Sequence, residues 1–313
     1  MKPRLAITCG DPAGVGPEII ARWVLERPRS AGHVTVLGPE SWLAGLHGRC
    51  NAQLVAVGDE KFCAKPGKPT LAGARVALAA MEVAAQGCTD GEFDAVVTGP
   101  VSKEWLAKVS PGFVGQTEFF AARWGGEPTM AFAGGKLRVA LATWHVPLKT
   151  VSRELTPERL ERAVRRADWL CRAEGIARPR IAVCGLNPHA GEHGLLGDEE
   201  ERWMKATLMR LRRSVPGLSE PLPSDTVFMR ALNGEFDATV AAYHDQGLAP
   251  LKAVDFDRSV NISLGLPHIR TSPDHGTAYG IAGRGTADGG SFAAAIRMAE
   301  RLAQAQARLG RPD

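Results

Sequence analysis

The sequence lacks several features that would assign the protein to a particular class. None of its cysteines forms a C-x-x-C pair, and several lie in apolar runs such as LAITCG and IAVCG. Paired redox or zinc-binding cysteines are therefore not expected, whereas buried, reduced cysteines typical of a cytoplasmic protein are. The cysteines are Cys9, Cys50, Cys63, Cys88, Cys171 and Cys184.

Long apolar runs are also missing. No segment approaches the length of a membrane span, and the apolar part of MKPRLAITCGDPAGVG is too short for a signal peptide. We therefore expect a cytoplasmic protein without a membrane partner.

No charge of one sign dominates. Lys and Arg together number 38 and Asp and Glu 34, and the net charge of +4 is not concentrated in a run or tail. This balance argues against nucleic acid as the main partner and leaves room for a local cationic pocket that holds a small anion. It favours an enzyme acting on a small molecule.

What the sequence contains is an alternation of short β-branched runs and amphipathic helical patterns. This alternation predicts an α/β protein whose largely parallel sheet is buried on both faces. The strand-like runs are RLAIT, HVTVLG, AQLVAV, DAVVTGP, LRVALAT, RIAVCGL, DATVAAY and VNISLGL, and the helices are expected at 17–26, 71–86, 156–174, 198–213 and 289–309. DGEFDAVV and NGEFDATV echo each other, and we interpret them as two similar helix-to-strand turns rather than as a duplicated half.

Three histidines follow predicted strands directly. His145, His189 and His244 come after VALATW, IAVCGLNP and ATVAAY, and ligands in open α/β sheets bind beyond the carboxyl ends of strands. Three imidazoles suit a borderline metal with positions open for substrate, although a histidine at a strand end is also a common structural residue. Asp245 either orients an imidazole, acts as a base, or caps the next turn.

Two further groups are suited to anions. Lys252, Asn261 and Arg270 offer cations and an orienting amide for a phosphate or carboxylate, unless they are ordinary surface residues. TCGDPAGVGPEII runs from a strand through a glycine loop into a helix, which presents backbone N–H groups to an anion or simply forms a tight turn. Because this loop lacks the G-x-G-x-x-G spacing, a Rossmann fold is not expected.

Over nearly its whole length the sequence resembles the 4-hydroxythreonine-4-phosphate dehydrogenase family of vitamin B6 biosynthesis. The matching stretches are GDPAGVGPE, VTGPVSK, GQTEFF, ATWHVPL, CGLNPHAGE, YHDQGL, VNISLGLPHIRTSPDHGTA and AGRGTAD. The resemblance implies a two-domain α/β/α architecture with mostly parallel sheets, like that of isocitrate and isopropylmalate dehydrogenases. The active site would lie in the interdomain cleft at a homodimer interface, with one domain at 1–115 plus 277–313 and a central domain at 116–276.

The resemblance also implies roles for the candidate residues. His145, His189 and His244 would bind a divalent metal (zinc, magnesium or cobalt) with ligands drawn from both chains of the dimer. Lys252, Asn261 and Arg270 would hold a small phosphorylated substrate together with Gln116 and Thr117. Our own catalytic candidates are Lys252, which with Arg270 would hold the anionic group, and Asp245, which would act as a base or orient a ligand. Gln116 replaces the histidine of the family pattern G-H-T-E-F and cannot carry a proton or a positive charge near neutral pH.

A more distant resemblance concerns the cofactor. GDPAGVGPE and DHGTAYGIAGRGTAD look like the GDGIGPE and HGSAPDIAGKGIAN stretches of isocitrate and isopropylmalate dehydrogenases, which bind NAD(P) without a Rossmann fold. The implied cofactor residues are Gly14, Gly16, His275, Gly276, Thr277 and Asp288. The aspartate that reads the ribose in those enzymes falls on Gly280, so the choice between NAD and NADP stays open.

The implied activity is NAD(P)- and metal-dependent oxidation of 4-(phosphooxy)-L-threonine. The β-keto acid product would decarboxylate to 3-amino-2-oxopropyl phosphate on the route to pyridoxal or pyridoxine 5'-phosphate. Two alternatives stay open: a dehydrogenase acting on phosphorylated threonate or erythronate or on a terephthalate dihydrodiol, and an acyltransferase of the phosphotransacetylase class, which uses neither NAD nor metal.

Overall fold

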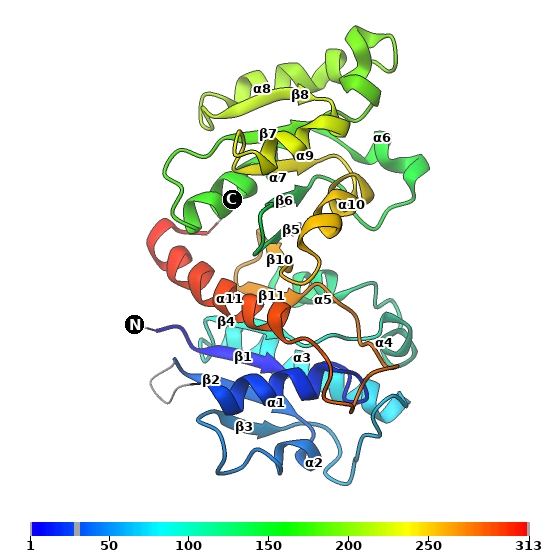
Figure 1. The fold of residues 1–313 in the computed structure, drawn as a ribbon, viewed down its shortest axis with the longest axis vertical. Coiled ribbons are helices and arrows are strands. Elements are labelled where there is room, and N and C mark those ends of the chain that lie inside the picture. The colour runs from blue at the N-terminus through cyan, green and yellow to red at the C-terminus, as the bar shows by residue number, and fades with distance from the viewer. Residues whose placement is uncertain (1, 28–31, 312–313) are drawn as a thin grey trace. The chain divides into compact units, whose positions relative to one another are not determined.

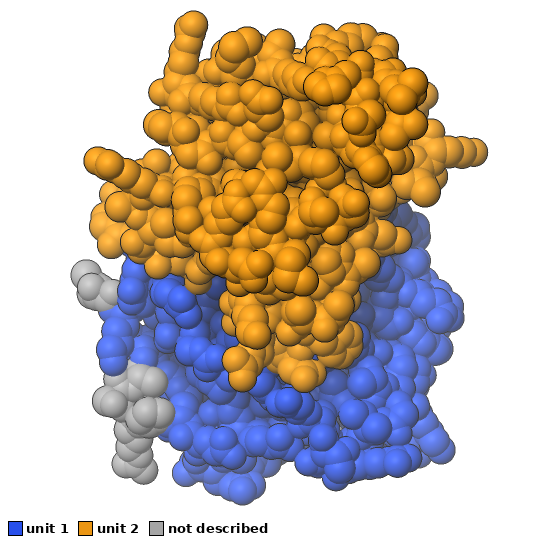
Figure 2. Space-filling view, turned by 45° about the horizontal axis from the view of Figure 1, so that its top comes forward, with its two compact units in different colours: residues 1–128, 266–307 blue, residues 129–265, 308–313 orange. Residues whose placement is uncertain are grey.

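The computed structural model describes residues 2–27 and 32–311. The chain divides into two compact units, which Figure 2 colours separately. Unit 1 comprises Met1–Pro128 and Leu266–Ala307, and unit 2 comprises Thr129–Gly265 and Arg308–Asp313. Figure 1 traces the elements of both units along the chain.

Unit 1 is built on a five-stranded parallel sheet in the order β3-β2-β1-β4-β11. Its strands are β1 (Leu5–Thr8), β2 (Val34–Gly38), β3 (Gln53–Ala56), β4 (Ala95–Thr98) and β11 (Ile269–Pro273). β11 comes from the second segment of the unit and pairs with β4. The carboxyl end of β4 therefore lies beside β11.

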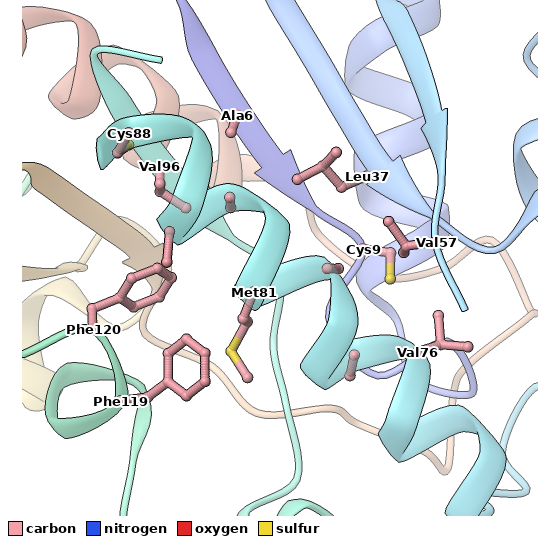
Figure 3. Packing of buried hydrophobic residues seen from close by; sticks show 14 of the residues in the cluster. Ala6, Cys9, Leu37, Val57, Val76, Met81, Cys88, Val96, Phe119 and Phe120 are labelled. Atoms are coloured by element: carbon pink, nitrogen blue, oxygen red, sulfur yellow. The ribbon is translucent and has the colours of Figure 1, made fainter. Parts of the chain in front are cut away.

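Helices cover both faces of this sheet, as Figure 1 shows for α1 and α11 on one face and α3 on the other. They are α1 (Gly16–Glu26), α2 (Glu40–Leu43), α3 (Leu71–Thr89), α4 (Lys103–Val109), α5 (Gln116–Trp124) and, for most of its length, α11 (Gly290–Leu309). α3 begins where the Thr70 hydroxyl accepts a hydrogen bond from Gly73 N at 3.1 Å, an ordinary N-cap. On the inner side of α3, Met81 packs with Phe119 and Phe120 of α5 in the core (Figure 3).

This packing bears on the division of the chain. We expected the first domain to end at 115 and to resume at 277, whereas the units divide at Pro128–Thr129 and at Gly265–Leu266. Phe119 and Phe120 bury α5 in the core of unit 1, and β11 pairs within the sheet of unit 1. Both elements therefore lie in unit 1 rather than in the central part of the chain.

Unit 2 is built on a six-stranded mixed sheet in the order β10-β5-β6-β9-β7-β8. Its strands are β5 (Thr129–Ala133), β6 (Val139–Leu141), β7 (Ile181–Cys184), β8 (Leu218–Leu222), β9 (Ala238–Ala241) and β10 (Val260–Leu264). β6, β9, β7 and β8 run parallel, while β5 is antiparallel to both of its neighbours. The ends of β6, β9 and β7 therefore point the same way.

The helical elements of unit 2 pack on both faces of its sheet. They are η1 (Leu148–Thr150), α6 (Val151–Glu154), α7 (Pro157–Ala173), η2 (Pro188–Gly194), η3 (Glu200–Met204), α8 (Lys205–Leu211), α9 (Ser224–Leu232) and α10 (His244–Asp255). Val227 of α9 and Leu248 of α10 share a core with Ala182 and Cys184 of β7. Residues alternate between the faces of a strand, so Ile181 and Val183 point to the opposite side.

The eight predicted strands and four of the five predicted helices are confirmed, and the fifth is interrupted. The pattern at 198–213 forms the π-helical turn η3 followed by α8. Three strands, β5, β8 and β11, were not predicted. β8 contains Pro221, and β11 reads IRTSP yet is buried throughout, so neither shows the apolar alternation of a typical strand.

The two echoing turns perform the same structural task in both units. Gly91 and Gly234 have φ values of +73° and +80°, which glycine adopts without cost. Asp94 accepts hydrogen bonds from the backbone and guanidinium of Arg4, and Asp237 does the same for Arg180. Each pair fixes the start of one strand against its parallel neighbour.

The sequence analysis also made predictions about the cysteines and about membrane-spanning segments. All six cysteines are free thiols, and burial raises the pKa of the Cys9 and Cys184 thiols above their ordinary value. Among residues 2–27 and 32–311, no helix combines the length and apolar character that crossing a bilayer requires.

Candidate active site

The three predicted histidines follow β6, β7 and β9, three parallel strands that are adjacent in the sheet of unit 2. His145 lies in the loop after β6, His189 in η2 after β7, and His244 is the first residue of α10 after β9. Since the carboxyl ends of adjacent parallel strands meet at one edge, the predicted placement at that edge is confirmed.

His145 and His244 form a pair. Their ring centroids are 5.8 Å apart and their planes are tilted by 35°. Two imidazoles on one tetrahedral metal have centroids about 5 Å apart, given metal–nitrogen distances of about 2.0–2.1 Å. The spacing is thus close to that of a metal-binding pair, although the part of the chain that the structure describes holds no group of three His, Cys, Asp or Glu side chains arranged for a metal ion.

Asp245 contacts the imidazole of His244 directly. Its Oδ1 lies 2.7 Å from Nδ1 of that ring, and its side chain is 87% exposed. A carboxylate on Nδ1 favours the tautomer with the proton there and leaves Nε2 as the available ligand atom. This geometry places Asp245 in an orienting position.

Hydrogen bonds between polar residues and backbone tie the three strand ends together. The Thr143 hydroxyl donates to Ala242 O at 2.7 Å, joining the end of β6 to the end of β9. Gln246 Oε1 accepts from Ala242 N at 2.7 Å, and its Nε2 donates to Gly185 O at 2.8 Å, joining β9 to β7. Sequence reasoning missed Thr143 and Gln246, although each lies two residues from a candidate histidine.

His189 is carried by an unusual backbone. Five consecutive residues, 189 to 193, have positive φ values between +44° and +82°. The His189 ring is exposed, with Nδ1 3.3 Å from Glu192 Oε2. His145 also has a positive φ, +50°, so two of the three imidazoles project from left-handed backbone.

Two predicted substrate residues lie in unit 2. Lys252 belongs to α10, the helix that begins with His244, and its Nζ lies 6.0 Å from the centroid of the Phe256 ring. Asn261 lies in β10, opposite Phe132 of β5. Both side chains are partly buried.

Arg270 lies in unit 1, on β11, and is 3% exposed. Its guanidinium donates twice to the hydroxyl of Thr98 at the end of β4, from Nε at 3.2 Å and from Nη2 at 2.8 Å. Burial lowers the pKa of Arg270 to about 9, and the carboxylate of Glu118 opposes this shift. The guanidinium therefore keeps its positive charge at neutral pH.

Gln116 and Thr117 open α5 close to the same strand end. Gln116 Nε2 donates to Gly99 O at 3.4 Å, while its Oε1 is buried without a hydrogen-bond partner among the described residues. Thr117 is 2% exposed. Since Arg270 contacts Thr98 and Gln116 contacts Gly99, the structure brings two predicted substrate residues to one place.

The glycine loop of unit 1 packs against the predicted cofactor segment. A Cβ on Gly14 would lie 2.8 Å from Thr277 O, and one on Gly16 would lie 2.4 Å from Cys9 O. Val15 N donates to Thr277 O at 2.9 Å. The two glycines thus permit close backbone approach, and the loop lies against the segment that begins at His275.

Charged residues at the start of unit 1 hold the rest of that segment. The Tyr279 hydroxyl donates to Asp11 Oδ2 at 2.6 Å, and burial and this hydrogen bond raise the pKa of Tyr279. Glu18 accepts from Gly283 N at 2.8 Å, and Arg22 donates to Ala287 O at 2.9 Å. Sequence reasoning did not single out these residues, which are separated from their partners by more than 260 positions.

Of the predicted cofactor residues, Asp288 already accepts a hydrogen bond within the described part of the chain, whereas one ring nitrogen of His275 does not. His275 Nε2 is buried without a hydrogen-bond partner within residues 2–27 and 32–311. Asp288 Oδ1 instead accepts from Gly290 N at 2.7 Å, at the start of α11. Gly276 and Gly280 have open space where a Cβ would lie. The segment therefore offers an imidazole nitrogen and unobstructed backbone to a ligand.

Mostly parallel strands that are covered by helices and carry polar side chains at their ends define an α/β protein with the layout of an enzyme. The family model described as pyridoxal phosphate biosynthetic protein PdxA matches residues 31–299, and the chain belongs to this family. A 4-hydroxythreonine-4-phosphate dehydrogenase of Thioalkalivibrio sulfidiphilus is 44% identical, covering 96% of this chain and 97% of its own length.

Solved structures agree with this assignment. The 4-hydroxythreonine-4-phosphate dehydrogenase of Klebsiella pneumoniae has a TM-score of 0.82 at 35% identity, covering 97% of this chain and 99% of that one. A terephthalate 1,2-cis-dihydrodiol dehydrogenase of Burkholderia xenovorans has a TM-score of 0.71 at 27% identity, with 96% and 98% covered. The named relatives are thus oxidoreductases.

The expected likeness to β-decarboxylating dehydrogenases is confirmed for the fold alone. Such an enzyme from Thermococcus kodakarensis has a TM-score of 0.53 at 17% identity, covering 96% of this chain and 83% of that chain. The mostly parallel α/β architecture predicted from the sequence is therefore the architecture found.

Proposed function

We propose that the protein is a dehydrogenase dependent on NAD(P) and a divalent metal that oxidises 4-(phosphooxy)-L-threonine. The β-keto acid would decarboxylate to 3-amino-2-oxopropyl phosphate, a step in pyridoxal 5'-phosphate biosynthesis. The observation that carries the proposal is the His145–His244 pair, 5.8 Å apart with Asp245 on the second ring, in a chain of the PdxA family.

The donor set fits a divalent metal held by His145, His189 and His244. Imidazole nitrogen suits zinc or cobalt better than magnesium, which prefers oxygen ligands. Because the structure brings only two of the three rings together, as the absence of a three-residue group among the described residues indicates, we propose that a second copy of the chain completes each site. The protein would then act as a homodimer.

The substrate phosphate would be bound through charge and hydrogen bonds. Arg270 is a buried cation that stays charged at neutral pH, and Gln116 carries an amide N–H donor near the end of β4, where it reaches Gly99 O at 3.4 Å. Thr117 would contact the phosphate, and Lys252 and Asn261 are proposed as further substrate-binding residues. A planar guanidinium with several donors matches the geometry of a phosphate.

The residues of the chain divide the remaining tasks. When bound, the metal would act as a Lewis acid on the substrate's secondary hydroxyl, and the nicotinamide would accept the hydride from the carbon that bears it. Asp245 contacts the imidazole of His244, so we do not propose it as the group that moves the hydroxyl proton. Lys252, on the same helix, is the group we propose to move the hydroxyl proton and to reprotonate the product after carbon dioxide leaves.

The cofactor would lie on the segment from His275 to Asp288. His275 Nε2 is buried without a partner among the residues described, and Gly276 leaves open space beside the backbone for a dinucleotide. Gly14 and Gly16 would support the site by letting their loop pack closely, Gly14 against Thr277 and Gly16 against Cys9. Position 280 is a glycine, so no carboxylate there repels a 2'-phosphate. We propose that both NAD and NADP are accepted, and the cytoplasmic location expected from the sequence stays a prediction.

A substrate panel tests this function. Purified protein is given 4-(phosphooxy)-L-threonine, phosphorylated threonate, phosphorylated erythronate or a terephthalate dihydrodiol, and NADH and NADPH are measured with and without divalent metal. The proposal expects the first substrate to have the highest kcat/KM. Preference for the unphosphorylated diol would replace it with the activity named for the relative from Burkholderia xenovorans, and acyl transfer without NAD reduction would replace it with the phosphotransacetylase class.

A further inference from the structure

The turn that carries His189 is held in an unfavourable conformation. Residues 189 to 193 all have positive φ, and His189, Ala190, Glu192 and His193 are not glycine. A Cβ makes left-handed backbone unfavourable, and runs of such residues are rare. Such a run persists when its surroundings fix it.

The fixing group is Glu200, which is fully buried at 0% exposure. Its Oε1 accepts from the backbone N of Asn187 at 2.8 Å, and its Oε2 accepts from Asn187 Nδ2 at 2.9 Å. Both oxygens thus hold the residue two positions before His189. A buried carboxylate requires partners of this kind.

Three glycines make room for Glu200 and Asn187 beside the turn. A Cβ on Gly191, inside the left-handed run, would lie 2.8 Å from Glu200 Oε2, and one on Gly185 would lie 3.0 Å from Oε1. A Cβ on Gly197 would lie 2.3 Å from Asn187 Nδ2. The chain therefore wraps closely around the contact between Glu200 and Asn187.

Glu200 is itself presented by irregular backbone. It is the first residue of the π-helical turn η3 (Glu200–Met204), and single π-turns occur frequently at functional sites. Gly185, which lies against Glu200, also accepts the hydrogen bond from Gln246. The carboxylate is thus linked to the end of β9, where His244 begins α10.

We propose that Glu200 is a positioning residue that fixes the left-handed turn 189–193 through Asn187 and so aims the His189 imidazole at the metal. This inference rests on the metal site of the proposed function and assigns a role to a residue that does not itself bind metal. Residues that orient metal ligands from behind typically change affinity by about 10- to 100-fold when replaced.

Glu200→Gln tests the proposal with little change in shape. The amide keeps one oxygen acceptor but turns an N–H group toward one of the two Asn187 donors, so one hydrogen bond is lost. Glu104→Gln is the control, because Glu104 lies in the first turn of α4, is exposed, and pairs with Lys108 on its own helix. Asn187→Ala is a second variant that removes the side-chain hydrogen bonds from Asn187 to Glu200 and to Glu199 and keeps the backbone one.

The first readout is amide hydrogen exchange of the metal-free proteins. Exchange should be faster across residues 186–197 in Glu200→Gln than in the wild type, with the rest of the chain unchanged and Glu104→Gln like the wild type. Unchanged exchange across 186–197 would overturn the assignment of Glu200 to the turn.

The second readout is cobalt affinity and the visible absorption of bound cobalt, which reports ligand number and geometry. Glu200→Gln should bind cobalt about 10- to 100-fold more weakly with an altered spectrum, Asn187→Ala should also bind it more weakly than the wild type, and His189→Ala marks full loss of the ligand. If Glu200→Gln does not fold, Asn187→Ala carries the test.

The outcomes separate this proposal from the proposed function. Equal cobalt affinity and spectra in wild type, Glu200→Gln and Asn187→Ala would overturn the positioning role alone. Absence of cobalt binding by the wild type would overturn the metal site and, with it, this inference.

Discussion

Nδ1 of His244 lies 2.7 Å from Oδ1 of Asp245, its neighbour in the chain. Consecutive residues at the start of α10 thus form an imidazole–carboxylate pair, and the other nitrogen of the ring is left for a ligand. This contact assigns Asp245 an orienting position among the roles that the sequence left open.

Replacing Asp245 should weaken metal binding modestly. Asp245→Asn keeps an acceptor but removes the charge, and solvent screens a side chain that is 87% exposed, so we expect a loss of about tenfold in cobalt affinity, at the low end for such residues. Titration of the apoprotein measures it. Asp257→Asn, an exposed carboxylate just beyond the same helix, is the control, and equal affinity in all three proteins would contradict the orienting role.

Restoring the family histidine at position 116 should introduce a new pH dependence. Gln116→His places a group with a pKa of about 6.5 beside the proposed phosphate site, so substrate affinity should rise as the pH falls through that value. KM measured from pH 5.5 to 8, relative to the wild type, tests this. Gln116→Ala, which adds no titrating group, should follow the wild-type profile. A variant histidine without any pH effect would place residue 116 away from the phosphate.

Arg270→Lys separates charge from geometry. Lysine keeps the positive charge but cannot place two donors on the Thr98 hydroxyl. The free energy of unfolding should therefore fall by about 1.5–3 kcal/mol. KM for the phosphorylated substrate should rise by about tenfold or more, because lysine lacks the planar guanidinium that donates two hydrogen bonds to one phosphate. Thr98→Val controls for the hydroxyl contact. A raised KM confined to Thr98→Val, with Arg270→Lys unchanged, would remove Arg270 from substrate binding.

The pairing of Arg180 with Asp237 should make stability depend on pH. The hydrogen bond from Arg180 holds the pKa of Asp237 below its ordinary value, so its stabilising effect is present above about pH 4 and is lost as the pH falls through the lowered pKa. Asp237→Asn should be less stable than wild type by about 1 kcal/mol at pH 7, after allowance for the partly exposed pair. Urea unfolding from pH 7 to pH 2.5 should show this difference shrinking. A constant difference would contradict the pairing.

The sequence predicted the strand-end placement of the histidines because that placement depends on local pattern. Apolar runs identify β6, β7 and β9, and parallel strands bring their ends to one edge regardless of the details of packing. Lys252 and Asn261 were singled out by residue type alone, and the structure places Lys252 in α10 and Asn261 near the start of β10. The assignment of roles needed the family resemblance, since no spacing distinguishes a ligand from a structural histidine.

Other features depend on contacts between distant residues, which periodicity does not report. Glu200 lies in a stretch that reads as a continuous helix, yet it begins a π-turn and turns inward to Asn187. Tyr279 reaches Asp11 across 268 positions. β11 is polar in sequence but buried because it pairs with β4, so neither its strand nor the boundary of unit 1 was visible locally.

Formation of NADH or NADPH from 4-(phosphooxy)-L-threonine, measured before and after removal of divalent metal, tests the central claim most directly. The account predicts that chelator-treated protein loses turnover, that zinc or cobalt restores it, and that carbon dioxide is released in equal amount with the reduced cofactor. Undiminished turnover in protein shown to contain no metal, or reduction of neither cofactor by metal-loaded protein, would contradict it.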